Sequence, residues 1–322
     1  MTASSLRDLY PPAQAYDQAR LAVAGGHQLY FEQRGSATGI PALVLHGGPG
    51  SGCSPAMARF FDPQRYRVIL LDQRGAGRSE PSGRREANTT ALLLEDMETL
   101  RRHLGLERWL LLGGSWGGTL GVLAAAAHPQ TVSGLLLRNP FLARQEDLDW
   151  FFDGARPLHD EAWQGWRQLG APEEAGAMLP WLEHRFNQGS PEEVQALTLT
   201  WHRWENALAR VEGAPLPTPE VLPRLTEKYR LQLHYFCRGC FLKANEVLEA
   251  AGTLGGLPTH ILQGRIDHVC PARGAEILQQ RMPGSRLQWI EGVGHDPYAP
   301  TMAAATVEAL DCFVREGRFS TD

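Results

Sequence analysis

The sequence predicts an α/β protein with a mostly parallel sheet flanked by helices and an inserted, all-helical segment. Two observations support this fold class. Short aliphatic runs at 41–47, 66–72 and 108–114 do not alternate with polar residues, which is typical of strands buried on both faces. Residues 142–245 instead hold helix-period segments without a strand signal. The length of 322 residues suits one core with a smaller added unit.

The first half of the chain follows a strand, helix, strand order. Between the second and third aliphatic runs, apolar residues keep helical spacing from Leu93 to Leu104. N-cap candidates precede this helix at 88–90, and Gly105 supplies its stop. A further strand at 132–139 follows a second helix. Strands joined by such crossovers lie parallel, so this half predicts an open parallel sheet.

The middle of the chain is predicted to interrupt this sheet. Strand-like runs resume only at 259–267 and 285–295, where a helix separates them. The sheet is therefore expected to continue after an inserted helical segment. We expect an α/β core formed by 1–141 and 246–322, with a helical cap formed by 142–245.

Composition and charge exclude several classes of partner. The 31 basic and 36 acidic side chains give a formal charge of −5, without the basic stripe of a nucleic-acid-binding protein. The N-terminus has no basic segment followed by an apolar one, as a secretory signal has. No segment reaches the roughly 18 consecutive apolar residues of a membrane span. We expect a soluble cytoplasmic protein that binds neither nucleic acid nor membrane.

The five cysteines form an odd, scattered set that does not indicate a disulfide framework. Cys237 and Cys240 form one C-x-x-C pattern. Metal sites usually need a second pair, or histidines at matching spacing, and none follows. We interpret the pair as two small buried thiols, with a redox or metal role as the minor alternative. No metal is expected.

The stretch RWLLLGGSWGGTLGVL at 108–123 surrounds one serine with glycines where an aliphatic strand ends. Residues 113–117 fit the pattern G-x-S-x-G, at the strand-to-helix turn that this motif requires. The flanking glycines allow strand and helix to approach closely, and the helix N-terminus favours developing negative charge. Ser115 is therefore a candidate nucleophile.

A serine hydroxyl needs a histidine base that is itself oriented by a carboxylate. In α/β hydrolases the three residues occur in the order Ser, Asp or Glu, His, on loops after later strands. Asp267 follows one of the late strands, and His295 follows the next. Asp296 is a rival carboxylate, but a residue adjacent to His295 points its side chain elsewhere. We predict a catalytic triad of Ser115, Asp267 and His295.

Acyl transfer also needs hydrogen-bond donors for the oxyanion. The loop LHGGPGSG at 45–52 follows a strand, where this fold supplies one backbone N–H. The residue after the nucleophile supplies the other. The predicted donors are Gly48 and Trp116. We interpret His46 and an Asp-Arg turn at 72–74 as supports for these loops.

Further motifs extend the pattern over nearly the whole chain. In order they read LYPP, HGGPGSGCSP, FFDPQRYRVILLDQRGAGRS, NTT, GGSWGGTLG, LRNPFLARQEDLDWFF, WHRWE, HYF, GRIDHVCP and GVGH. Together they resemble the prolyl aminopeptidases (proline iminopeptidases), serine peptidases of the α/β-hydrolase fold. The resemblance implies release of N-terminal proline from short peptides by the predicted triad. No cofactor is implied, because the triad and the backbone donors suffice.

The resemblance also implies a substrate site in the cap. Glu205, in WHRWE, would bind the substrate, because a proline imino group is cationic at neutral pH. Phe141, Phe151 and Phe236 are candidates for the pocket around the proline ring. Ordinary core packing is an equal alternative for these three rings.

One residue of the predicted substrate site departs from the family pattern. Members typically carry a second acidic residue close to HYF, and this chain has Gln232 there. A glutamine can accept a hydrogen bond but brings no charge. We therefore expect Gln232 to weaken the selection of a cationic N-terminus.

Three functions are compatible with these features. The first is a prolyl aminopeptidase that forms a prolyl ester on Ser115. The second is an esterase or amidase with a different small acyl substrate, which Gln232 permits. The third is a ligand-binding protein without catalysis, since a fold alone does not imply a function. The complete triad argues against the third.

Overall fold

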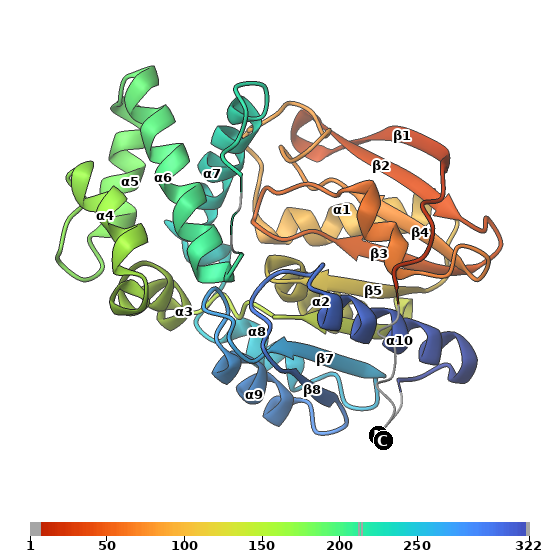
Figure 1. The fold of residues 1–322 in the computed structure, drawn as a ribbon. Coiled ribbons are helices and arrows are strands. Elements are labelled where there is room, and N and C mark those ends of the chain that lie inside the picture. The colour runs from red at the N-terminus through yellow and green to blue at the C-terminus, as the bar shows by residue number, and fades with distance from the viewer. Residues whose placement is uncertain (1–7, 212, 214, 320–322) are drawn as a thin grey trace.

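The structure, a computed structural model, describes residues 8–211, 213 and 215–319. Within them, eight strands form one sheet in the order β1-β2-β4-β3-β5-β6-β7-β8 (Figure 1). The strands are β1 (Ala15–Val23), β2 (His27–Gly35), β3 (Ile40–Leu45), β4 (Tyr66–Leu71), β5 (Trp109–Gly114), β6 (Val132–Arg138), β7 (Thr259–Gly264) and β8 (Arg286–Ile290). Neighbours from β4 to β8 are parallel, whereas β2 runs antiparallel to both β1 and β4. The predicted fold class is confirmed.

Helices cover both faces of this sheet (Figure 1). One face packs against α1 (Thr90–His103), α2 (Trp116–Ala127), α8 (Glu246–Ala251) and α9 (Ala272–Arg281), and the other against α10 (Pro300–Glu316). Strand β3 shows why its sequence is a continuous aliphatic run. Leu43 and Leu45 join the first core, and Ala42 and Val44 join the second. Because successive side chains alternate between faces, both sets must be apolar.

Between β6 and β7, the described residues form helices and no strand. Besides α8, the α-helices there are α3 (Gln145–Asp149), α4 (Asp160–Gln168), α5 (Met178–Gln188), α6 (Pro191–Ala209) and α7 (Leu222–Phe236). Figure 1 shows α4 to α7 as a separate group beside the sheet. We call α3 to α7 the helical insertion. The exact division of the chain at 142 and 245 stays a prediction.

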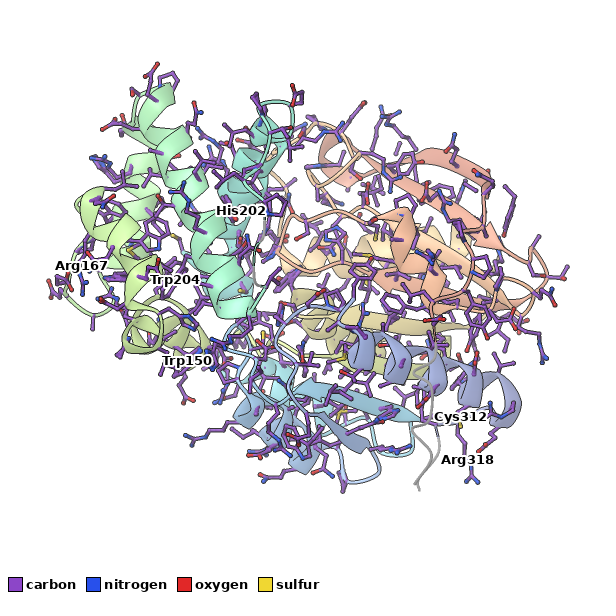
Figure 2. All side chains as sticks on the ribbon, viewed as in Figure 1. Trp150, Arg167, His202, Trp204, Cys312 and Arg318 are labelled. Atoms are coloured by element: carbon purple, nitrogen blue, oxygen red, sulfur yellow. The ribbon has the colours of Figure 1, made fainter. Side chains whose placement is uncertain are left out.

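Buried tryptophans form the core of the helical insertion. They are Trp163, Trp166, Trp201 and Trp204. The ring of Trp201, on α6, stacks on Tyr229 of α7 with the centroids 4.9 Å apart. Trp150 lies where the insertion meets the sheet, and its Nε1 donates to the carbonyl oxygen of His268 over 2.8 Å (Figure 2). The insertion is thus packed internally and tied to a loop that follows β7.

No helix in the described part of the chain is long and apolar enough to cross a bilayer. The cytoplasmic location stays a prediction. In the C-x-x-C pair, Cys240 is buried, Cys237 is partly buried, and neither is disulfide-bonded. Burial raises the pKa of the Cys237 thiol to about 12, so this thiol is protonated at neutral pH.

Candidate active site

The candidate nucleophile lies on a sharp turn between β5 and α2. Ser115 has φ 54° and ψ −123°, a conformation that few residues other than glycine adopt. A Cβ on Gly117 would lie 2.1 Å from the carbonyl oxygen of Leu45, and one on Gly113 would lie 2.2 Å from that of Gly117. Only glycine therefore allows the helix to start this close to the sheet, which is why the serine is flanked by glycines.

Gly117→Ala is expected to lower the free energy of unfolding by roughly 1–3 kcal/mol, the usual cost of overpacking a tight site. The new methyl group would collide with backbone rather than with a flexible side chain. Urea unfolding measures the change. Gly284→Ala is the control, because a Cβ there meets nothing within 4 Å. Equal stability of the two variants would show that the turn tolerates a side chain.

The surroundings of Ser115 leave its hydroxyl exposed to a cavity. The backbone N–H donates to the carbonyl oxygen of Arg138 over 3.0 Å, which fixes the turn to β6. The Oγ lies 3.9 Å from the Sγ of Cys270. Burial raises the pKa of this thiol well above its ordinary value, with Asp267 adding to the effect. Cys270 is therefore a neutral thiol, not a rival nucleophile.

His295 and Asp267 form a short contact at the ends of β7 and β8. The Nδ1 of His295 lies 2.6 Å from Oδ2 of Asp267. The other carboxylate oxygen, Oδ1, accepts from the backbone amides of Val269 at 2.8 Å and Cys270 at 3.0 Å. The carboxylate is fully buried, so these contacts hold it in one orientation. With Nδ1 engaged, Nε2 is the histidine nitrogen that remains to take up a proton.

The end of α6 fixes the loops that carry these two residues. The carbonyl oxygen of Leu208 accepts from the amide of His268 over 3.2 Å, and that of Ala209 accepts from the amide of His295 over 3.0 Å. The last carbonyls of a helix have no partner within the helix, and here the loops after β7 and β8 supply donors to them. The helix that carries Glu205 is therefore hydrogen-bonded directly to the backbone of His295.

The two predicted oxyanion donors lie on opposite sides of Ser115 in the sequence. Gly48 has φ +114°, and Trp116 is the first residue of α2. Within the described part of the chain, neither backbone amide donates a hydrogen bond. Both N–H groups are thus available to an oxygen of a bound acyl group.

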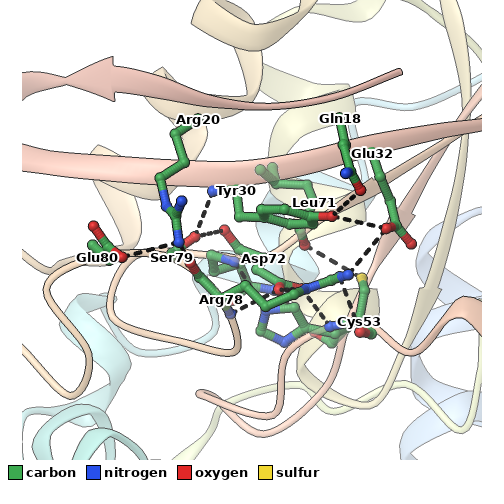
Figure 3. Close-up of polar contacts among 12 residues, drawn as sticks. Gln18, Arg20, Tyr30, Glu32, Cys53, Leu71, Asp72, Arg78, Ser79 and Glu80 are labelled. Carbon is green, nitrogen blue, oxygen red and sulfur yellow. Dashed lines mark hydrogen bonds and ion pairs between the residues drawn. The ribbon is translucent and has the colours of Figure 1, made fainter. Parts of the chain in front are cut away.

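A buried ionic cluster holds the loop after β3 at Cys53 (Figure 3). The Asp72 carboxylate is buried and accepts from the backbone amide of Cys53 at 2.6 Å and from Nε of Arg78 at 2.8 Å. The same guanidinium donates to Glu32 over 3.0 Å. The cluster links the loop after β3 to the loop after β4, and it lies apart from the reacting groups.

The predicted supporting residues bind the loops around the site. Gln73 accepts from Nε1 of Trp116 over 3.1 Å and donates through Nε2 to the carbonyl oxygen of His46 over 3.0 Å. Within the Asp-Arg turn at 72–74, Asp72 accepts from the backbone amide of Cys53, and Arg74 forms an ion pair with Asp96. Both ends of the turn are thus bound to other parts of the chain.

A cavity of about 280 Å³ connects these groups to the helical insertion. Ser115, His295 and Gly48 line it on the sheet side. Its lining on the insertion side includes Phe141, Phe151, Phe236, Glu205, Asn206, Lys228 and Gln232. Of the ten site residues predicted from the sequence, eight line this cavity, and Trp116 and Asp267 do not. We call its insertion side the acyl pocket.

Three phenylalanines form the apolar wall of the acyl pocket. The ring centroids of Phe141 and Phe236 lie 5.9 Å apart, and those of Phe151 and Phe236 lie 6.4 Å apart. Each ring is at most 9% exposed. They therefore pack on one another and also line the cavity, and their role in substrate binding stays a prediction.

The polar wall of the acyl pocket centres on Glu205. Its Oε2 lies 2.5 Å from Nζ of Lys228 and accepts from the hydroxyl of Tyr229 at 2.9 Å. Its Oε1 accepts from Nε2 of Gln232 at 3.0 Å. Burial raises the pKa of Glu205, but Lys228 and the hydrogen bonds together bring this pKa below its ordinary value. Glu205 is therefore ionised, and its charge is already balanced within the chain.

Sequence reasoning missed Lys228. The one signal available is its position four residues before Gln232, which places both on the same face of α7. Its partner on α6 lies 23 residues away, and no spacing rule connects the two helices.

Comparisons with known proteins agree with this architecture. Residues 41–299 match the model of the alpha/beta hydrolase fold family. VinJ has a similar solved structure, with a TM-score of 0.67, 19% identity, and coverage of 94% of this chain and 99% of VinJ. The esterase RhEst1 from Rhodococcus sp. ECU1013 has a TM-score of 0.62 and 20% identity, over 93% of this chain and 98% of the esterase. At such identities the likeness shows the fold alone.

Curated relatives are closer in sequence. The probable proline iminopeptidase of Leptolyngbya boryana is 36% identical over 97% of this chain and 98% of that relative. The proline iminopeptidase of Arabidopsis thaliana is 38% identical over 94% of this chain and 81% of its own. The proline iminopeptidase of Xylella fastidiosa (strain 9a5c) is 37% identical over 96% of this chain and 100% of that relative. With this identity over nearly its whole length, the chain belongs to the proline iminopeptidase family, serine hydrolases with the α/β-hydrolase fold.

Proposed function

We propose that the protein is a serine aminopeptidase that releases N-terminal proline from short peptides. One observation carries the proposal. The cavity that holds Ser115 and the Asp267–His295 pair ends in a small apolar pocket walled by phenylalanine rings. A pocket of this kind fits a pyrrolidine ring next to the scissile carbonyl.

Acylation uses the three triad residues in distinct roles. His295 takes the proton of the Ser115 hydroxyl at Nε2 while Oγ attacks the prolyl carbonyl carbon. The amides of Gly48 and Trp116 donate to the carbonyl oxygen as it becomes negative. The C–N bond then breaks, and His295 gives its proton to the leaving amine. A prolyl ester of Ser115 remains.

Deacylation reverses the proton transfers with water in place of the amine. His295 takes a proton from water as the hydroxyl group attacks the ester carbonyl. The bond from carbonyl carbon to Oγ breaks, Ser115 recovers its proton from His295, and proline leaves as the free acid. Asp267 stays ionised throughout and stabilises the imidazolium form of His295.

A panel of aminoacyl arylamides, with nitrophenyl acetate as a simple ester, tests the proposal. Among arylamides of unmodified amino acids, turnover confined to the prolyl compound is the expected result, because the apolar pocket fits a five-membered ring. Labelling of Ser115 by a fluorophosphonate probe should accompany it. A protein that hydrolyses the ester but no arylamide would contradict release of proline, and a folded protein that the probe does not label would contradict the mechanism.

Glu205→Gln is expected to cost roughly 2–4 kcal/mol in transition-state binding of prolyl arylamide, measured as kcat/KM. The substitution leaves the ammonium of Lys228 without its counter-ion in the acyl pocket, and this charge repels the substrate cation. Hydrolysis of nitrophenyl acetate should be spared. Glu183→Gln is the control, because its ion pair with Arg238 is on the surface of the insertion. Equal losses on both substrates would assign Glu205 a purely structural role.

A second candidate function is hydrolysis of an ester or amide with a small uncharged acyl group. The ion pair of Glu205 and Lys228 favours it, because an acyl pocket without net charge offers no excess attraction to a cation. The same triad and oxyanion donors would serve this reaction. The arylamide panel separates the two candidates.

A further inference from the structure

The acyl pocket already contains a cation. Nζ of Lys228 contacts Oε2 of Glu205 at 2.5 Å, and both side chains line the cavity, with 20% and 18% of their side-chain surface exposed. The hydroxyl of Tyr229 donates a second hydrogen bond to the same oxygen. A substrate cation that sought this carboxylate would compete with an ammonium held in place by the fold. The chain thus neutralises its own anionic site.

Gln232 adds an unpaired acceptor beside this ion pair. Its Nε2 lies between two acceptors, Oε1 of Glu205 at 3.0 Å and the carbonyl oxygen of Gly48 at 3.3 Å. The amide is therefore oriented with its nitrogen toward them, since an oxygen there would be repelled. Its Oε1 is buried and has no hydrogen-bond partner within the described part of the chain. An unpaired buried acceptor is costly, and an N–H from a bound ligand would satisfy it.

Lys228 and Gln232 both line the cavity from neighbouring turns of α7, so together they supply one donor and one unpaired acceptor. An ammonium has three N–H donors, and Glu205 accepts only one from Lys228. Gln232, four residues later on the same helix, presents the acceptor. A group that carries an N–H next to a carbonyl oxygen matches both. A protonated proline ring matches only the acceptor, because it has no ring oxygen and brings a second positive charge.

We propose that Lys228 is a specificity-determining residue that makes the acyl pocket select an N-terminal residue with an uncharged nitrogen. The substrate class is a five-membered lactam, such as an N-terminal 5-oxoprolyl group. Its ring N–H would donate to Oε1 of Gln232, and its ring carbonyl oxygen would accept from Lys228. The inference rests on the proposed acyl-enzyme mechanism, and it changes only the acyl group that this mechanism prefers.

The test compares prolyl and 5-oxoprolyl arylamides that share one leaving group. The rings have the same size, so the phenylalanine wall treats them alike, and the pair differs in charge and in one oxygen. The wild type should hydrolyse the 5-oxoprolyl compound with a kcat/KM at least equal to that of the prolyl compound. Nitrophenyl acetate, which reaches neither polar group, reports whether each variant keeps an intact triad.

Two different substitutions make the pocket more negative by one charge. Lys228→Met removes the ammonium, and Gln232→Glu adds a carboxylate. Each should raise kcat/KM for the prolyl compound by about ten- to hundredfold, the value of a hydrogen bond to a charged group. Lys228→Met should also slow the 5-oxoprolyl compound, because its lactam oxygen loses a donor. Lys243→Met is the matched control, because it removes the other lysine of the chain, which is exposed and does not line the cavity.

A ratio of the two arylamides that both variants leave unchanged would overturn the role of Lys228. A wild type that prefers the prolyl compound by more than about a hundredfold would overturn it too, because that preference needs an uncompensated carboxylate. In either case prolyl turnover still supports the proposed function. A wild type that hydrolyses the acetate ester but neither arylamide would contradict both proposals. Because Gln232→Glu keeps the lysine, it provides the test if Lys228→Met fails to fold.

Discussion

Ser115→Ala is expected to reduce turnover of every substrate by on the order of 10⁴- to 10⁶-fold, the usual cost of losing a triad nucleophile. Alanine keeps the Cβ, so the strained backbone of the turn between β5 and α2 is unchanged. The hydroxyl makes only a 3.9 Å contact with the thiol of Cys270, so little packing is lost. Thermal unfolding should match the wild type. A variant that keeps a tenth of the activity would contradict the acyl-enzyme mechanism.

Cys270→Ala is the matched control for this prediction, because Cys270 carries the nearest alternative nucleophile. Burial raises the pKa of its thiol, and a protonated thiol is a poor nucleophile. Removal of the thiol should leave fluorophosphonate labelling of Ser115 intact and reduce kcat by less than about tenfold. If the alanine variant at Cys270 were as inactive as that at Ser115, the thiol would have a direct part in the reaction.

The parallel part of the sheet could be predicted because burial on both faces requires consecutive apolar residues, a pattern that can be recognised in the sequence. Strands β3 to β6 contain aliphatic runs, and the alternation of Leu43 and Val44 between two cores explains why both faces of β3 are apolar. The edge strand β1 has no such apolar run. Most of its side chains are exposed, so AYDQARLAV resembles a loop as much as a strand, and the hairpin with β2 was not predicted.

The candidate site divides in the same way. Ser115, Asp267 and His295 could be proposed because each follows a strand, and the carboxyl ends of parallel strands meet at one edge of a sheet. The partner of Glu205 could not be proposed. Its contact with Lys228 depends on how α6 packs on α7, and this packing is fixed by buried rings such as Trp201 rather than by sequence spacing.

Asp267→Asn is expected to lower kcat by about 10⁴-fold while the fold is kept, the effect of holding a triad histidine in the wrong tautomer. The backbone amides of Val269 and Cys270 donate to Oδ1, so an asparagine would keep its oxygen there. Its amide nitrogen would then face Nδ1 of His295 at the present position of Oδ2. That nitrogen donates, so Nδ1 must accept and the ring proton must move to Nε2. A histidine protonated at Nε2 cannot take the proton of Ser115.

The measurement compares Asp267→Asn with Asp296→Asn on prolyl arylamide, together with the rate of fluorophosphonate labelling. Asp296 is the other carboxylate near His295, but it accepts from the backbone amide of Tyr298 over 2.8 Å instead of from the imidazole. Its substitution should change kcat by less than about threefold. Labelling of Ser115 should slow in the Asp267 variant alone, because labelling also requires removal of the hydroxyl proton. If the two variants lost activity equally, the tautomer argument would fail, and the buried contact between Asp267 and His295 would have to act through the shape of the loops rather than through the proton on Nε2.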